Sequence, residues 1–277
     1  MSDVRNGTSA TPRAFAERLL ATLPRGAVGS DGAGEPNWLT GCYLHGSAAL
    51  GGWNPSRSDV DLLLVVSEWS CALSDALTAA LTSPSIPCPG QGLECSVVEA
   101  SAARTPGAPW PFLLHINTST DTSAASGMPS TRDRVRVVDG GAMPGDIDLL
   151  MHYTVTRSRG VTVAGSPPAV AIGEVPRDAV LMYLHDELEW GLAHATEPYV
   201  VLNALRAADY ARDGNLLSKV AAGLAALDDA DLPPGLVRRA LAAQTGEAPA
   251  GTPGPDATAV VRRTQALLTA AAREADG

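Results

Sequence analysis

The most informative part of the sequence is GSAALG at residues 46–51, which is followed after residues 52–57 by SDVDLLLVV at residues 58–66. The second segment starts with Asp59 and Asp61 and then becomes wholly apolar, which predicts a central β-strand buried on both faces. Alternate side chains of a strand point to the same face, so the two carboxylates should project together. The functional end of this strand is therefore predicted to be its N-terminal end.

The Asp59–Asp61 pair predicts a metal site. Two neighbouring carboxylates repel each other, and an apolar strand behind them weakens their solvation. A divalent cation relieves the repulsion, and carboxylates together with phosphate oxygens are typical of a magnesium site. Taken alone, an Asp-x-Asp pair is better explained as the solvated end of a strand.

The Gly46-Ser47 turn strengthens this interpretation. A strand that ends in Gly-Ser and turns into a helix presents backbone N–H groups and a hydroxyl to an anion. Taken alone, such a turn is as easily an ordinary one, and the chain has no GxxxxGK[ST] phosphate loop. The turn and the acidic pair are separated by one short connection. Together they indicate a phosphate and metal site more specifically than either feature alone.

The order of hydrophobic patterns predicts strands in the first half of the chain and helices in the second. We predict helices over 12–22 and 70–82 and strands over 42–45, 59–66, 93–98 and 111–116. Residues 25–37 are predicted to be a loop, and residues 118–132 a loop or a lid. From Asp178 onward, apolar residues recur every three or four positions, which is typical of helices. We predict helices from 178, over 199–212 and 216–227, after Pro233-Pro234 and after Asp256. We therefore predict domains at 1–172 and 173–277.

Composition limits the class of protein and its partners. The 277 residues are 45% apolar, enough for one or two cores, and carry a formal charge of −10. That charge disfavours nucleic acid and anionic membranes as partners and suits a small cationic substrate. The chain shows no apolar run of the ~20 residues that a membrane span needs, a polar N-terminus unlike a signal peptide, and no CxxC spacing. We expect a cytoplasmic monomer.

Several motifs resemble one enzyme family. The Gly-Ser, spacer and Ser-Asp-x-Asp-Leu pattern resembles the nucleotidyltransferase superfamily that includes DNA polymerase β. The longer match YLHGSA at 43–48 with SDVDLL at 58–63 resembles the aminoglycoside 3''-adenylyltransferases, which act on streptomycin and spectinomycin. Further similarity lies in LECSVV at 93–98, VVLNALR at 200–206 and SKVA at 218–221. The resemblance implies an α+β fold, with a mixed sheet and flanking helices in an N-terminal nucleotidyltransferase domain and an α-helical bundle after it.

The resemblance implies roles for three carboxylates. Asp59 and Asp61 would bind Mg²⁺, and Glu94 would be the third carboxylate of the metal site and the general base for the substrate hydroxyl. A strand beside the acidic pair can direct Glu94 to the same face. Metal ions would clamp the α-phosphate between the attacking hydroxyl and the leaving pyrophosphate.

The resemblance also implies how ATP, the co-substrate, would be bound. Gly46, Ser47 and Ser58 would hold its triphosphate. Lys219 would reach the phosphates from the helical domain, so the active site would lie between the domains. Lys219 is the only lysine among 20 basic residues, which agrees with a position where a compact charge on a flexible stem is needed.

A polycationic antibiotic requires carboxylates and aromatic faces. The candidates in the helical domain are Glu197, Trp190, Asp186, Glu187 and Tyr199. Each acidic residue is, by itself, equally explained as part of a solvated helix face.

Two segments depart from the family pattern. Streptomycin-active members have a longer loop between these helices, with a second Trp and an added Asp, whereas this chain has only residues 191–196 there. The segment 112–117 does not align with the family's aromatic substrate contact, and His115 and Asn117 are either cleft residues or packed sheet residues.

We predict that the chain transfers AMP from Mg-ATP to a hydroxyl of an aminoglycoside or aminocyclitol, of spectinomycin or streptomycin type, releasing pyrophosphate and giving antibiotic resistance. The alternatives are the same transfer onto a protein or a biosynthetic intermediate, and a catalytically silent nucleotide-binding module. The charge of −10 disfavours an RNA-tailing enzyme.

Overall fold

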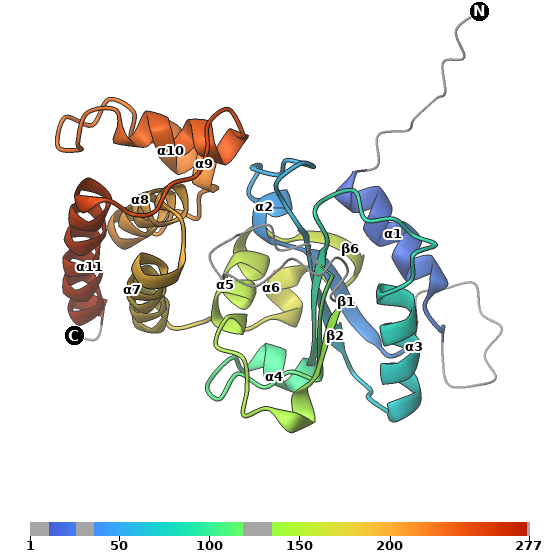
Figure 1. The fold of residues 1–277 in the computed structure, drawn as a ribbon. Helices are drawn as coiled ribbons and strands as arrows, with labels where there is room; N and C mark the ends of the chain where they lie inside the picture. Colours follow the sequence, from blue (N-terminus) through green and yellow to red (C-terminus); the bar gives the residue numbers. More distant parts are fainter. Residues whose placement is uncertain (1–10, 26–35, 119–134, 276–277) are drawn as a thin grey trace, which may run out of the picture.

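The computed structural model describes residues 11–25, 36–118 and 135–275 (Figure 1). Residues 1–10, most of the predicted loop 25–37 and all of the predicted loop 118–132 except Thr118 lie outside the described residues. Within the described part of the chain, no helix combines the length and apolar character that crossing a bilayer requires.

The N-terminal half is built on a six-stranded sheet in the order β5-β4-β3-β2-β1-β6. The strands are β1 Leu39–Leu44, β2 Val60–Val66, β3 Leu93–Glu99, β4 Leu114–Asn117, β5 Arg136–Asp139 and β6 Val161–Gly165. Strands β2 and β3 run parallel, whereas the other neighbours pair antiparallel, so the predicted mixed sheet is confirmed.

The central strand β2 is buried on both faces, as its apolar run predicts. Leu62 and Leu64 belong to one apolar core, whereas Leu63 and Val65 belong to another on the opposite face. This alternation follows from the two-residue period of a strand. Asp61 has the same parity as Leu63, so its side chain lies on the face of the second core.

Helices cover both faces of the sheet (Figure 1). One face is covered by α1 Pro12–Thr22 and α3 Cys71–Leu81, and the other by α4 Ala100–Arg104, α5 Leu149–Arg159 and α6 Pro168–Ala171. The first helix has the predicted start, since the Thr11 hydroxyl accepts a hydrogen bond of 3.2 Å from Ala14 N and Pro12 occupies the first turn.

The second half is helical and packs beside the α5 face of the sheet (Figure 1). It consists of α7 Arg177–His194, α8 Glu197–Asp213, α9 Lys219–Ala225, α10 Leu236–Thr245 and α11 Pro255–Ala275. Gly214 ends α8 in the left-handed conformation, with φ 71°, as its position predicts. The predicted helix 216–227 begins later, at Lys219, because the Ser218 hydroxyl caps it by accepting a hydrogen bond from Ala221 N.

Several elements were not predicted, among them β5, β6 and α5. The helix α5 has the sequence LLMHYTVTRSR, in which Thr154, Val155 and Thr156 are β-branched and have low helix propensity. Burial of Leu149, Leu150 and other side chains against the core outweighs that local preference.

One apolar core joins the two halves. It runs from Leu63 and Val65 of the sheet through Leu150 of α5 to Val180 of α7 and Val201 of α8. The predicted boundary between residues 172 and 173 lies just after α6, and this core continues across it.

Candidate functional site

The three predicted carboxylates meet at one end of the sheet. Asp61 of β2 lies directly beside Glu94 of β3 in the parallel register, and neighbouring strands are about 4.8 Å apart. Asp59 precedes β2 by one residue, two positions before Asp61. All three lie at the end of the sheet face that α5 and the C-terminal helices cover.

Asp61 lies in an unfavourable position for a negative charge. Burial raises its pKa well above the ordinary carboxyl value, and the neighbouring charges of Glu94 and Asp59 raise it further. A hydrogen bond from the Ser47 backbone and the positive charge of Lys219 act in the opposite direction. A bound cation would therefore stabilise the ionised form of this carboxylate.

The donor chemistry of these residues fits a hard cation such as Mg²⁺, which prefers carboxylate oxygens. The charge repulsion at Asp61 supports that fit. With the side chains as they stand, however, the described residues contain no group of three or more His, Cys, Asp or Glu that could hold a metal ion. The magnesium site therefore stays a prediction.

The Gly46 turn is held tightly against the acidic pair. Gly46 has φ +52°, and a Cβ atom at this position would lie 2.0 Å from Asp61 Oδ2, so only glycine fits. The preceding His45 N donates a hydrogen bond of 3.1 Å to the Asp61 carbonyl. The Ser47 hydroxyl is buried and has no hydrogen-bond partner among the described residues, which leaves it available to a ligand.

Ser58 closes the loop between the turn and the acidic strand. Its hydroxyl accepts a hydrogen bond of 3.1 Å from Asn54 N, and its own N–H donates to the Asn54 carbonyl at 2.7 Å. The hydroxyl hydrogen of Ser58 is not used in this pair, so it can still be donated to an anion.

Lys219 faces the acidic residues from the helical half. Its Nζ lies 4.2 Å from the centre of the Tyr199 ring, within cation–π range. Burial lowers the pKa of Lys219 from 10.5 to about 8; the charge of Arg206 acts in the same direction, and Glu187, Asp61 and Asp59 oppose it.

The two halves touch beside Lys219. A Cβ atom at Gly52 would lie 2.6 Å from Ser218 Cβ and 2.9 Å from its Oγ. The loop after Gly46 therefore approaches the N-terminal end of α9 so closely that only glycine fits. The contact thus lies one residue before Lys219, the first residue of α9.

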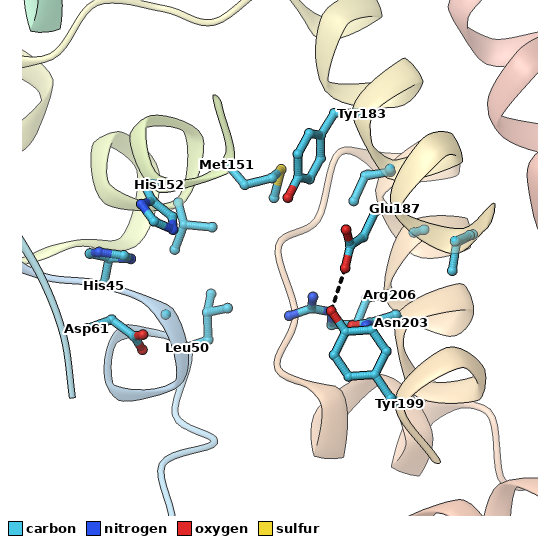
Figure 2. Close-up of a pocket in the computed structure, with 15 residues that line it drawn as sticks. His45, Leu50, Asp61, Met151, His152, Tyr183, Glu187, Tyr199, Asn203 and Arg206 are labelled. Carbon is cyan, nitrogen blue, oxygen red and sulfur yellow. Dashed lines mark hydrogen bonds between the residues drawn. The ribbon is translucent and has the colours of Figure 1, made fainter. Parts of the chain in front are cut away.

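A cavity of about 190 Å³ lies between the halves. Figure 2 shows the side chains that line it. His45 and Asp61 lie on the sheet side, with His152 of α5 above them, whereas Glu187, Tyr199 and Arg206 come from the helices opposite. The cavity thus brings the acidic end of the sheet together with side chains of α7 and α8.

A larger neighbouring cavity of about 950 Å³ carries acidic and aromatic side chains. Four of the five predicted substrate residues line it: Asp186, Glu187, Trp190 and Tyr199. Trp190 is 50% exposed, and its ring lies edge-on to Tyr199 and stacks on His194. A half-exposed tryptophan beside carboxylates is a surface suited to a cationic ligand.

Glu187 and Tyr199 form one unit. The Tyr199 hydroxyl donates a hydrogen bond to Glu187 Oε1, the dashed line in Figure 2. Burial raises the pKa of Glu187, and the hydrogen bond from Tyr199 opposes this rise. Burial and the neighbouring Glu187 raise the pKa of Tyr199, so its hydroxyl stays a donor.

Glu197, the remaining predicted substrate residue, lines neither of these cavities. It begins α8 and faces the other way, toward the loop before α11 and Arg239. Its Oε2 accepts from Gly254 N at 3.4 Å, and its Oε1 lies 3.9 Å from Arg239 Nε. These contacts give Glu197 a local structural role, and its substrate role stays a prediction.

Reasoning from the sequence missed several residues that line the two cavities. Tyr183 precedes Glu187 by four residues and Trp190 by seven, and Asn203 and Arg206 follow Tyr199 at the same intervals. The helical period could therefore have identified them. Asp148, Met151 and His152 belong to or border α5, which was not predicted.

His115 and Asn117 lie on β4, inside the sheet, and line neither cavity. The His115 ring lies 3.1 Å from the Ser96 hydroxyl, and burial lowers its pKa. Asn117 stands opposite Glu94 in the β3–β4 register.

No protein-family model matches the chain, and no curated protein matches its sequence. Among solved structures, its fold is similar to that of spectinomycin adenyltransferase AAD(9) from Enterococcus faecialis, determined with ATP and spectinomycin. The TM-score is 0.58 at 16% sequence identity, and the match covers 84% of this chain and 92% of that chain. The predicted α+β fold, with a mixed sheet followed by a helical C-terminal region, is thereby confirmed.

Proposed function

We propose that this chain is an adenylyltransferase, which transfers AMP from Mg-ATP to a hydroxyl of an aminocyclitol or aminoglycoside antibiotic. The observation that carries the proposal is the juxtaposition of Asp61 and Glu94 with Lys219 across an interdomain cleft. Carboxylates on one wall and a cation on the other are what a magnesium-bound triphosphate requires. In this proposal residues 1–172 form the nucleotidyltransferase domain and residues 173–277 the helical domain.

On the ATP side, the residues bind and orient the triphosphate. Ser47 and Ser58 donate hydroxyl hydrogens to it, and Gly46 allows its close approach. Lys219 supplies positive charge from the opposite wall. Arg206 is a second cation in the same cleft, since it lines the smaller cavity. Preorganised charge of this kind stabilises the transition state more than the ground state.

The reaction is an in-line displacement at the α-phosphorus. Glu94 takes the proton of the acceptor hydroxyl, the hydroxyl oxygen forms the new bond to phosphorus, and the bond to pyrophosphate breaks. Asp59, Asp61 and Glu94 would hold magnesium, which neutralises phosphate charge when bound.

On the acceptor side, the larger cavity favours a cationic ligand. Asp186 and Glu187 offer negative charge, and Trp190 and Tyr199 offer aromatic faces. The formal charge of −10 attracts such a ligand from solution. The connection between α7 and α8, residues 195–196, is too short for the second Trp of streptomycin-active family members, so spectinomycin is the first acceptor to test. The active unit is a monomer and its role is antibiotic resistance.

The deciding experiment measures pyrophosphate release from Mg-ATP with spectinomycin, streptomycin and other aminoglycosides, using Glu94→Ala as the control. We expect release with at least one drug and its loss in the control. ATP binding without release would contradict the proposal and favour another acceptor or a silent nucleotide-binding module.

A further inference from the structure

The helix α5 carries His152 to the junction of the two cavities. Its side chain, 16% exposed, lines both of them. Its Nε2 atom lies 3.9 Å from Glu94 Oε1, the carboxylate proposed as the base. None of the motifs in the sequence indicates this residue, and the transfer chemistry described so far does not use it.

The His152 ring contacts a second histidine ring. It packs against the His45 ring, with 4.7 Å between the centroids and 43° between the planes. Figure 2 shows the two rings next to each other. His45 is only 3% exposed, and it immediately precedes the Gly46 turn. This tilted ring contact limits rotation of His152 and links its position to the turn that contacts Asp61.

The other ring nitrogen of His152, Nδ1, makes no hydrogen bond among the described residues. This atom is also buried. A buried polar atom without a partner costs free energy, so such atoms in native proteins usually contact water or a ligand. A tautomer with hydrogen on Nε2 directs a donor at Glu94 and leaves Nδ1 as an acceptor.

We propose that His152 is a positioning residue that holds Glu94 in the orientation in which it receives the proton of the acceptor hydroxyl. The inference rests on the proposed function, because it assigns Glu94 the role of base. The separation of 3.9 Å exceeds a hydrogen bond, and such contacts often tighten only when substrate binds. His152 thus acts through Glu94 and not on ATP.

The test compares His152→Leu and His152→Gln, with kcat and KM measured for ATP and for the best acceptor. We expect His152→Leu to lower kcat by about 10- to 100-fold, as is typical when a residue that orients a functional group is lost. The KM for ATP should stay within about twofold. His152→Gln should recover most of kcat, because its amide nitrogen can replace Nε2.

A double-mutant cycle separates positioning from general destabilisation. In a Glu94→Gln background, His152→Leu should lower kcat by less than about twofold, since the group it orients is already gone. Thr154→Ala is the matched control on α5: it removes a hydroxyl that donates only to the Leu150 carbonyl, and it should leave kcat unchanged. If His152→Leu does not fold, His152→Gln and His152→Asn carry the test, and only Gln should retain activity.

Each remaining outcome would overturn the inference. A wild-type enzyme that transfers AMP while His152→Leu retains kcat, or shows additive losses with Glu94→Gln, removes His152 from this role alone. Equal activity of the Gln and Asn variants does the same. A wild-type protein that binds ATP but transfers AMP to no drug overturns the proposed function and this inference together.

Discussion

The Tyr183 hydroxyl on α7 donates a hydrogen bond of 2.8 Å to Asp148, the residue that precedes α5. Both residues line the larger cavity. Burial and the nearby Asp148 and Glu187 carboxylates raise the pKa of Tyr183, so the hydroxyl stays protonated and remains the donor. The bond connects the helical half to the sheet half at the wall of the proposed acceptor site.

Tyr183→Phe removes this bond and keeps the ring. We expect the free energy of unfolding to fall by about 1 kcal/mol, the usual contribution of one hydrogen bond. Urea denaturation measures the change. Tyr153→Phe is the matched control, because the buried Tyr153 hydroxyl has no hydrogen-bond partner among the described residues and its removal should cost nothing. Equal losses in the two variants would contradict the importance of the Tyr183–Asp148 bond.

Gly52→Ala should weaken ATP binding. The added methyl group would lie 2.6 Å from Ser218 Cβ, so the loop and the N-terminal end of α9 must separate, and Lys219 moves with them. We expect the Kd for ATP to rise about tenfold, or about 1.4 kcal/mol, in a calorimetric titration. Gly107→Ala, where nothing lies within 4 Å of the added atom, should bind ATP normally. Unchanged affinity in Gly52→Ala would show that the contact does not position Lys219.

The lowered pKa of Lys219, about 8, makes ATP affinity depend on pH. The triphosphate binds the charged ammonium, so above pH 8 binding must also take up a proton. Affinity should therefore fall by up to about tenfold per pH unit above pH 8, and stay level below it.

Lys219→Arg is the control for this titration, because a guanidinium keeps its charge throughout the range. Its ATP affinity can be lower, but it should not vary between pH 7 and pH 9. A wild-type profile as flat as that of Lys219→Arg would remove Lys219 from the triphosphate site. The pH dependence of folding stability without ATP has the opposite sign. The unfolded chain holds the Lys219 proton more tightly than the folded chain, so the free energy of unfolding rises with pH above 8.

Tyr199 joins the two substrate sites, and its two interactions can be separated. Tyr199→Phe removes the hydrogen bond to Glu187 and keeps the ring next to Lys219. We expect the KM for the cationic acceptor to rise about fivefold, equivalent to ~1 kcal/mol, with the KM for ATP unchanged. Tyr199→Leu also removes the cation–π contact and should raise both KM values. If the Phe variant alters only the KM for ATP, the assignment of Glu187 to the acceptor is wrong.

The acidic end of the site could be predicted because its signals are local. Asp59 and Asp61 share a face through the two-residue period of a strand, and the apolar run behind them requires a central position in the sheet. The neighbouring register of Asp61 and Glu94 follows once both strands belong to one sheet. The helix caps at Thr11 and Gly214 could also be predicted from the sequence, since each depends on one residue and its neighbours.

The residues on the opposite side of the candidate site could not be predicted in the same way. His152 and Asp148 depend on α5, whose β-branched residues do not favour a helix until the core covers them. Glu197 lines neither cavity, because its side chain faces Arg239 and Gly254, which are distant in sequence. Such pairings arise from tertiary packing, and no periodicity within one element indicates them.

The apolar core that runs from Leu63 of the sheet to Val201 of α8 has a consequence for cooperativity. A wide hinge motion at the cleft would bring these side chains into water, at a cost of about 25 cal/mol for each Å² exposed. We therefore expect the cleft to admit its ligands through small rearrangements of loops and side chains. Calorimetry should accordingly record a single endotherm, with both halves melting together.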